Sequence, residues 1–271
     1  MLHNDDTGSA GHPGPTAARA TPDDHRLAAV VAEQAGALLL TLRARLVAEG
    51  AESAALKQQG DREAHLLILG LLAERCRAGD ALLSEEGADD QARLAAERVW
   101  IVDPLDGTRE YSEPPRTDWA VHVALVVAGH PVAGAVALPA LGMTLTTDPA
   151  PAPPPPHTGA PRVIVSRSRP PAAATWLAEA MGADLVEMGS AGAKAMAVVR
   201  GEAEVYAHSG GQYEWDSCAP VAVAAAAGLH VSRLDGSPLR YNNANPYLPD
   251  LLICRAELAA PVLAALARFD G

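Results

Sequence analysis

The chain has 271 residues, enough for one large domain or two of modest size with a substantial core. Hydrophobic residues make up 49% and charged residues 20%, which is typical of a globular chain and excludes a wholly disordered one. The formal charge is −12, which argues against binding to nucleic acid or to an anionic membrane surface. If the substrate is anionic, something other than net charge must neutralise it, and a bound metal ion is the simplest candidate.

Targeting and redox signals are weak. Apolar runs such as 119–128 are far shorter than the roughly 20 residues of a membrane helix. The first 25 residues contain no apolar export segment. Cys76, Cys218 and Cys254 are far apart and form no CxxC or Cys/His spacing, which predicts neither a disulfide framework nor a zinc site. We expect a cytoplasmic protein with reduced thiols.

The first half of the chain predicts helices followed by strands. Residues 1–22 lack apolar periodicity and predict a disordered tail. Asp23 or Asp24 then caps a helix that runs to about Ala48, and a second helix extends from about Arg62 to Arg77. Short strands are expected after these helices, at 81–83, 99–102, 120–127, 132–138 and 141–146. This order favours an α+β arrangement.

A proline-rich stretch separates the two halves. Residues 148–161 contain seven prolines, too many for a helix interior or a central strand, and predict a linker or an exposed loop. Beyond it strands and helices alternate, which favours an α/β layer. The expected strands are 163–165, 185–187, 205–206, 229–231 and 251–254, and the expected helices are 171–181, 191–199, 217–227 and 258–268. We predict two packed domains, 23–148 and 162–271, joined by 149–161.

The segment 100–111, with the sequence WIVDPLDGTREY, carries the most informative motif. An apolar strand leads directly into two carboxylates three residues apart, Asp103 and Asp106. Pro104 between them opposes a helix and predicts a turn at the end of the strand. Such a turn can direct both carboxylates and the Leu105 carbonyl at one point, an all-oxygen set that suits Mg²⁺.

Backbone groups after this pair could complete an anion site. Gly107 permits close approach of the backbone to a ligand, and the amides of Gly107 and Thr108 could face a phosphate. Asp, Pro and Gly are also the usual residues of an acidic β-turn, and the spacing alone leaves both interpretations open.

Two further acidic clusters lie outside the segment 100–111. Glu85 and Glu86 follow a short strand, and adjacent like charges are either solvated in a loop or share a cation. Asp216 precedes a predicted helix with Pro220 in its first turns. A carboxylate there either caps the helix or presents an oxygen to a metal ion.

In chain order, these three clusters resemble the Mg²⁺-dependent, lithium-sensitive phosphatase family of inositol monophosphatase, fructose-1,6-bisphosphatase and 3′(2′),5′-bisphosphate nucleotidases. The resemblance spans roughly residues 26–268 and rests on SEE at 84–86, DPLDGT at 103–108 and WDSCAP at 215–220. Further segments are similar to the CysQ-type nucleotidases of actinobacteria, namely REY at 109–111, GSAGAK at 189–194 and DGSPLRYN at 235–242. The resemblance implies a layered αβαβα sandwich.

The resemblance also implies a metal site for two or three Mg²⁺ ions. Glu85, Asp103 and the Leu105 carbonyl would bind the first ion, and Asp103, Asp106 and Asp216 would bind the second.

Thr108 and Asp61 resemble the pair that orients and deprotonates the attacking water. The approach to Asp61, KQQG at 57–60, departs from the Thr-x-x-Asp pattern of the family. The alternative is that Asp61 caps the predicted helix at 62–77.

For substrate binding, the resemblance implies contacts from Leu105, Asp106, Gly107, Thr108, Ser190 and Lys194. Lys194 lies early in a predicted helix, where amides and one cation make a plausible anion site, although a solvated surface charge is the alternative. Lys194 is the best candidate for the cation that a second phosphate requires. Arg167 and Arg169 are further candidates or are surface charges. His122 is expected to be an ordinary strand residue, and Cys218 a small buried helix residue rather than a nucleophile.

The leading hypothesis is a phosphomonoesterase that converts 3′-phosphoadenosine 5′-phosphate to AMP and phosphate by attack of a metal-activated water. The sulfated form of that nucleotide is a second candidate substrate. The same site would serve inositol 1-phosphate or fructose 1,6-bisphosphate, and a rival from another class is a non-catalytic nucleotide- or metal-binding regulator. Family resemblance implies lithium sensitivity, a role in sulfur metabolism and compatibility with a homodimer.

Overall fold

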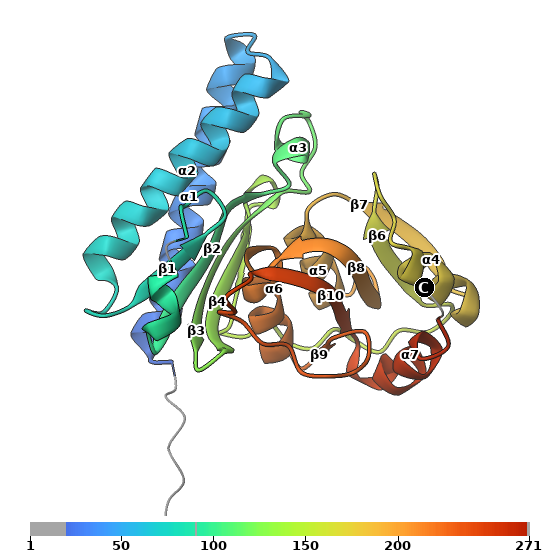
Figure 1. Cartoon of the computed structure of the whole chain (residues 1–271). Coiled ribbons are helices and arrows are strands. Elements are labelled where there is room, and N and C mark those ends of the chain that lie inside the picture. Colours follow the sequence, from blue (N-terminus) through green and yellow to red (C-terminus); the bar gives the residue numbers. More distant parts are fainter. Residues whose placement is uncertain (1–19, 90, 270–271) are drawn as a thin grey trace, which may run out of the picture.

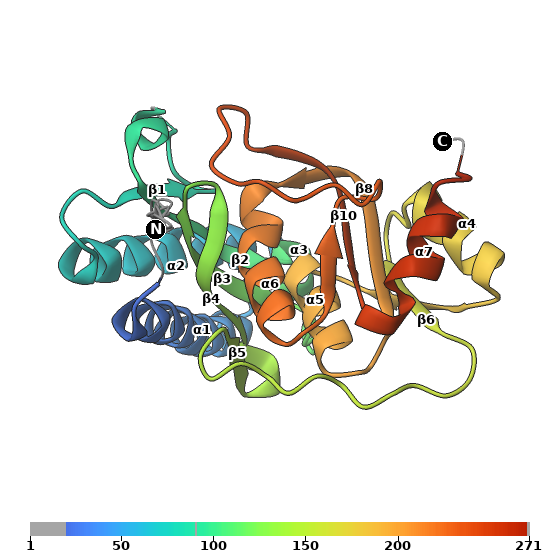
Figure 2. The same ribbon diagram turned by 90° about the horizontal axis from the view of Figure 1, so that it is seen from below.

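The computed structural model describes residues 20–89 and 91–269, which form a layered sandwich of helices and sheets (Figure 1). Two five-stranded sheets stack with helices between them and outside each of them (Figure 2). The αβαβα sandwich implied by the sequence resemblance is confirmed.

The first sheet comes from the first half of the chain and has the order β1-β2-β3-β4-β5. β1 and β2 pair in parallel, and the later pairs are antiparallel. The strands are β1 (Ala81–Ser84), β2 (Arg98–Asp106), β3 (Ala120–Val127), β4 (His130–Leu138) and β5 (Met143–Thr146). Every residue of β3 is buried, because helices cover both faces of this sheet.

The second sheet comes from the second half and has the order β7-β6-β8-β10-β9. β6 pairs in parallel with β7 and β8, and β10 pairs antiparallel with β8 and β9. The strands are β6 (Arg162–Ser166), β7 (Asp184–Met188), β8 (Val205–Tyr213), β9 (His230–Ser232) and β10 (Tyr247–Cys254). Residues 147–161, which join the sheets, contain no helix or strand, as their prolines predict.

Helices form three layers around the sheets. α1 and α2 cover the outer face of the first sheet, α5 and α6 lie between the sheets, and α4 and α7 cover the outer face of the second sheet (Figure 2). The helices are α1 (Pro22–Ala48), α2 (Ser53–Arg75), α3 (Thr108–Tyr111), α4 (Ala172–Met181), α5 (Ala191–Val199), α6 (Glu214–Ala226) and α7 (Ala259–Leu266). The central hydrophobic cluster draws residues from both halves of the chain.

α1 is, within the described ranges, the one helix long and apolar enough to cross a membrane by length and composition. Its side chains at Val31, Ala35 and Leu39 are fully buried in the cluster that α1 shares with α2 and the first sheet. That burial is what a core helix requires.

The start of α1 corrects the sequence prediction. The cap is Thr21 rather than Asp23 or Asp24, and the helix begins at Pro22. Asp24 accepts a hydrogen bond from the Thr21 backbone at 2.7 Å and so completes a capping box. Residues 1–19 of the predicted tail lie outside the described residues.

Several elements run further than the sequence predicts. β8 continues to Tyr213, β10 begins at Tyr247, and α6 begins at Glu214. α2 begins at Ser53 instead of Arg62, because its apolar stripe continues toward its N-terminus through Gly60 and Leu56. A Cβ on Gly60 would lie 2.8 Å from both the Leu105 and the Tyr111 side chain, so glycine lets α2 approach the end of β2 closely.

β2 continues through the DPLD segment instead of turning before it. Its pairing with β3 changes register between Asp103 and Asp106, so Pro104 lies in a bulge where no ladder hydrogen bond is required of it. The bulge places the two carboxylates at the end of a buried strand.

Candidate active site

Carboxylates from both halves of the chain meet where β2 ends. Asp103 and Asp106 lie in the last residues of β2, and Asp216 lies in the first turn of α6. One carboxylate oxygen from each lies within 4.8 Å of the other two. Asp216 also accepts a hydrogen bond from the Tyr213 amide at 2.7 Å, so it caps the helix from within its first turn while belonging to the cluster.

Glu85 reaches this cluster from the turn that follows β1. β1 and β2 are parallel neighbours, so their C-terminal ends lie at the same edge of the sheet. Burial raises the pKa of Glu85 to about 7, a hydrogen bond with Asp103 opposes the shift, and the charges of Asp106 and Glu86 add to it. Glu85 is therefore part of the acidic cluster.

The pKa values of the cluster show a shortage of positive charge. Burial, with the charges of Glu85 and Asp106, raises the pKa of Asp103 well above its ordinary value. Burial and the charge of Asp106 raise the pKa of Asp216 to about 7. A divalent cation would relieve this repulsion, and carboxylate oxygens are the ligands that Mg²⁺ takes. The residues present fit a Mg²⁺ site.

Asp106 differs from the other acids because the start of α5 stabilises its charge. Its carboxylate accepts hydrogen bonds from the Ser190 hydroxyl at 2.5 Å, the Ala191 amide at 3.1 Å and the Gly192 amide at 2.6 Å. Burial alone would raise the pKa of Asp106, but His122 and these donors lower it to about 2. Asp106 is thus fixed as a carboxylate, and it ties the end of β2 to α5.

His122 is a site residue that sequence reasoning missed. It lies on β3, is fully buried, and its Nε2 is 3.2 Å from Oδ2 of Asp106. Its Nδ1 lies 3.0 Å from the Trp215 carbonyl oxygen, next to Asp216. Burial lowers the pKa of His122, but the charge of Asp106 outweighs it and the net shift is upward. The signal in the sequence is a histidine within an apolar strand. The β2–β3 register then places His122 opposite Asp103.

Asp61 and Thr108 come together at the edge of the cluster. Asp61 lies inside α2, so the alternative that it caps a helix is wrong. Oγ1 of Thr108 lies 3.3 Å from Oδ1 of Asp61 and 3.1 Å from the Leu105 carbonyl oxygen. Burial, with the charge of Glu86, raises the pKa of Asp61 to about 6. The two side chains that the sequence resemblance pairs are therefore neighbours in the fold.

Comparison with known proteins places this site in a family. A sequence model described as the inositol monophosphatase family matches residues 24–149 and 159–268. The chain belongs to the inositol monophosphatase family. The family is metal-dependent, and in this member the buried triad of Asp103, Asp106 and Asp216 is a fitting place for the metal.

Individual relatives are similar over most of their length. A Mycobacterium tuberculosis protein named 3′-phosphoadenosine 5′-phosphate phosphatase is 52% identical over 241 residues, which cover 86% of this chain and 89% of that protein. The Escherichia coli 3′(2′),5′-bisphosphate nucleotidase CysQ is 29% identical over 198 residues, with 69% and 80% covered. Among solved structures, CysQ from Bacteroides thetaiotaomicron matches with a TM-score of 0.71 and 26% identity, with 86% and 97% covered.

In this member of the family, a cavity of about 600 Å³ opens beside Thr108. Its walls come from the start of α3, the loop after β6 and the start of α5, so both halves of the chain contribute. The lining residues are Gly107, Thr108, Arg109, Glu110, Ser166, Ser168, Arg169, Gly189, Ser190 and Lys194. Four of the six predicted substrate residues thus line one space, whereas Leu105 and Asp106 are not among its lining residues.

Lys194 is part of this wall and not a solvated charge. Its side chain is buried, and Nζ donates hydrogen bonds to the carbonyl oxygens of Gly189 at 2.8 Å and Ser190 at 2.7 Å. Nζ also lies 5.4 Å from the centroid of the Tyr206 ring. Burial lowers the pKa of Lys194. The prediction for Cys218 is confirmed, since its side chain is fully buried and burial raises the pKa of its thiol.

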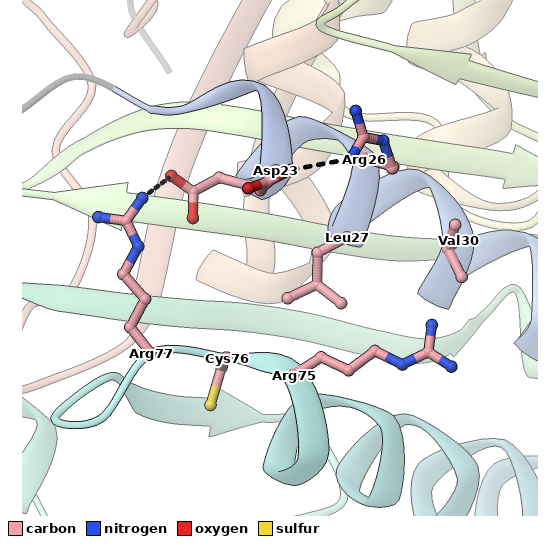
Figure 3. A pocket seen from close by; sticks show the side chains of 8 residues that line it. Asp23, Arg26, Leu27, Val30, Arg75, Cys76 and Arg77 are labelled. Atoms are coloured by element: carbon pink, nitrogen blue, oxygen red, sulfur yellow. Dashed lines mark hydrogen bonds and ion pairs between the residues drawn. The ribbon is translucent and has the colours of Figure 1, made fainter.

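A second cavity, of about 360 Å³, lies between the first turn of α1 and the last turn of α2 (Figure 3). Arg26, Arg75 and Arg77 line it together with the apolar side chains of Leu27 and Val30 (Figure 3). It shares no residue with the acidic cluster or with the cavity beside Thr108.

Proposed function

We propose that this chain is a Mg²⁺-dependent phosphomonoesterase that hydrolyses 3′-phosphoadenosine 5′-phosphate to AMP and phosphate. The observation that carries the reaction class is the buried carboxylate triad of Asp103, Asp106 and Asp216 beside the Asp61–Thr108 pair. The choice of substrate is supported by the relatives that carry the corresponding names, at 52% identity in Mycobacterium tuberculosis.

Two Mg²⁺ ions, or three, are proposed for the cluster. Glu85, Asp103 and the Leu105 carbonyl would hold one ion, and Asp103, Asp106 and Asp216 a second. Bound there, Mg²⁺ would neutralise the phosphate dianion, lower the pKa of water and stabilise the departing alkoxide.

Side chains of the protein accept the proton of the attacking water. When the Thr108 hydroxyl donates to Asp61, its oxygen remains free to accept a hydrogen bond from the attacking water. The proton lost by that water then passes to the carboxylate of Asp61, which is ionised at neutral pH with a pKa of about 6. No side chain becomes phosphorylated in this scheme.

The second phosphate of a bisphosphate nucleotide requires a further cation, and most cations near the cavity already have partners. Arg109 pairs with Glu113 at 3.1 Å, and Arg167 pairs with Glu113 and Glu110, each at 2.7 Å. Lys194, the cation predicted from the sequence for the second phosphate, instead donates hydrogen bonds to two carbonyl oxygens.

Arg169 is the remaining cation of the cavity. Its side chain has no hydrogen-bond or ion-pair partner among the residues that the structure describes. We therefore assign the second phosphate to Arg169, beside the Ser166 and Ser168 hydroxyls. The rest of the substrate would lie against Leu105, Asp106, Gly107, Thr108, Ser190 and Lys194.

The cell compartment is part of the proposal. Cys76, Cys218 and Cys254 are free thiols in the fold. We propose the cytoplasmic location expected from the sequence, because unpaired thiols of this kind stay reduced there.

Phosphate release from 3′-phosphoadenosine 5′-phosphate, inositol 1-phosphate and fructose 1,6-bisphosphate at equal Mg²⁺ tests the function. We expect the nucleotide to have the highest kcat/KM. Arg169→Ala should lower kcat/KM for the nucleotide by about ten- to a hundredfold, since a charge-assisted contact contributes about 1.5–3 kcal/mol. Inositol 1-phosphate has no second phosphate and should change much less.

Arg109→Ala is the matched control, because Arg109 lines the same cavity but is already paired with Glu113. Equal losses on both substrates in Arg169→Ala would remove Arg169 from the phosphate site. No phosphate release from any substrate with Mg²⁺ would favour the non-catalytic regulator instead.

A further inference from the structure

His65 makes a side-chain contact that the proposed mechanism does not use. It lies on α2, and its Nδ1 is 3.0 Å from Oγ of Ser84, the last residue of β1. Ser84 is buried and directly precedes Glu85. The hydrogen bond therefore joins a helix to the strand end from which a proposed metal ligand extends.

The turn that carries Glu85 has few other supports. Within residues 84–87, the Glu85 amide donates to the Val102 carbonyl at 3.3 Å and the Gly87 amide to the Ser84 carbonyl at 3.2 Å. A cavity of about 300 Å³, lined by His65, Ser84, Glu86 and Gly87, leaves the same side of the turn without close packing. Besides the hydrogen bond between Glu85 and Asp103 inside the cluster, the His65 contact is the side-chain anchor that reaches this turn from α2 among the described residues.

Repulsion works against the position of this turn. The charges of Asp106, Glu86 and Asp61 all act unfavourably on an ionised Glu85. A turn that carries two adjacent glutamates beside other acids is pushed outward unless a contact holds it. The bond between His65 and Ser84 opposes that displacement.

α2 also carries Asp61, four residues before His65. That spacing is about one helical turn, so both side chains lie on the same face of α2. One directs a carboxylate to Thr108, at 3.3 Å, and the other holds Ser84. The position of α2 therefore couples the proposed base to the proposed metal ligand.

We propose that His65 is a positioning residue that, through Ser84, holds Glu85 at the metal-binding cluster. The proposal rests on the metal-dependent function proposed above. Residues that orient a metal ligand from outside its coordination sphere typically contribute ten- to a hundredfold to metal affinity.

The test is direct Mg²⁺ binding by isothermal titration calorimetry on the full chain without substrate. His65→Ala should weaken Mg²⁺ binding about tenfold, and Ser84→Ala should do the same. Because both remove one contact, the double variant should bind no more weakly than either single variant. His65→Asn, whose amide occupies the place of Nδ1, should restore most of the affinity. Turnover should approach the wild-type value when Mg²⁺ is raised to saturation.

His25→Ala is the matched control. Its Nδ1 lies 2.6 Å from the Thr147 hydroxyl, the same kind of contact at a place far from the cluster. It should leave Mg²⁺ affinity unchanged, and circular dichroism should show that all variants are folded.

Wild-type affinity in His65→Ala, or additive losses in the double variant, would overturn the positioning role alone. A wild-type protein that binds no Mg²⁺ would overturn the proposed function and the positioning role together.

Discussion

Gly192 and His122 are in contact because glycine has no side chain. A Cβ built on Gly192 would lie 2.0 Å from Nε2 of His122, a distance that no real contact permits. At the same time the Gly192 amide donates to Asp106 at 2.6 Å. One glycine therefore allows α5, β3 and the end of β2 to meet at the acidic cluster.

Gly192→Ala should disrupt this junction. Either the His122 ring or the start of α5 must move, and either movement disturbs Asp106. We expect a loss of about 1–3 kcal/mol in the free energy of unfolding from overpacking, together with at least a tenfold loss of kcat. Urea unfolding and phosphate release measure the two effects.

The matched control is Gly70→Ala, in the interior of α2. A Cβ there would meet nothing within 4 Å. Alanine should stabilise the helix by about 0.5–1 kcal/mol and leave turnover unchanged. Wild-type turnover in Gly192→Ala would show that the junction tolerates movement.

The three acidic segments could be predicted from the sequence because each follows a recognisable break in the pattern. Asp103 and Asp106 follow an apolar strand, Glu85 follows another, and Asp216 opens a helix. Local pattern places these groups on elements, but only the family resemblance predicted that they meet.

His122 and the true extent of α2 could not be predicted in this way. The role of His122 depends on the β2–β3 register, which no local pattern fixes. The polar run KQQGD at 57–61 looks like a helix boundary, yet Gly60 lies inside α2 where the helix approaches Leu105. Tertiary packing overrides local propensity at that point.

Asp103→Asn should separate stability from activity. Asp103 is buried and its pKa is raised well above the ordinary value, so in the metal-free fold its ionised form is destabilising at neutral pH. In EDTA the variant should therefore melt above the wild type. Its turnover with Mg²⁺ should fall by orders of magnitude, because an amide is a poor Mg²⁺ ligand.

Differential scanning fluorimetry with EDTA and with Mg²⁺ measures the Tm of the wild type and of Asp103→Asn. Mg²⁺ should raise the Tm of the wild type more than that of Asp103→Asn. A variant that melts below the wild type in EDTA, or that keeps its turnover, would contradict the placement of Asp103 in the metal site.

Asp61→Asn should remove catalysis without removing the metal. The amide cannot accept the proton from water, so kcat should fall by about 10²–10⁴-fold. Mg²⁺ affinity measured by calorimetry should stay within a few-fold of the wild type, since Asp61 is not a proposed ligand. Glu63→Gln removes an exposed carboxylate from the same helix and should leave kcat unchanged. A large drop in Mg²⁺ affinity for Asp61→Asn would instead make Asp61 a ligand.

Asp24, in the first turn of α1, should make the free energy of unfolding depend on pH in the acid range. Figure 3 shows Arg77 beside the start of this helix. The Asp24 carboxylate accepts hydrogen bonds from Thr21, from Arg77 at 3.1 Å and from Arg98 at 2.7 Å. Burial alone would raise the pKa of Asp24, but these donors lower it from 3.8 to about 2. A carboxyl with a lower pKa in the folded state stabilises the fold above the unfolded pKa of 3.8, and that contribution is lost as pH falls toward 2.

Asp24→Asn should therefore lower the free energy of unfolding by about 2 kcal/mol at pH 7. Urea unfolding of wild type and variant across pH 7 to 3 should show the gap narrowing below pH 4. Asp23→Asn is the matched control, because the side chain of Asp23 is 86% exposed and its ion pair with Arg26 contributes little. Deletion of residues 1–22 removes Thr21, the cap of α1. It should lower the free energy of unfolding by about 1 kcal/mol. A gap between wild type and Asp24→Asn that stays constant with pH would show that the side chain acts by packing rather than by its charge.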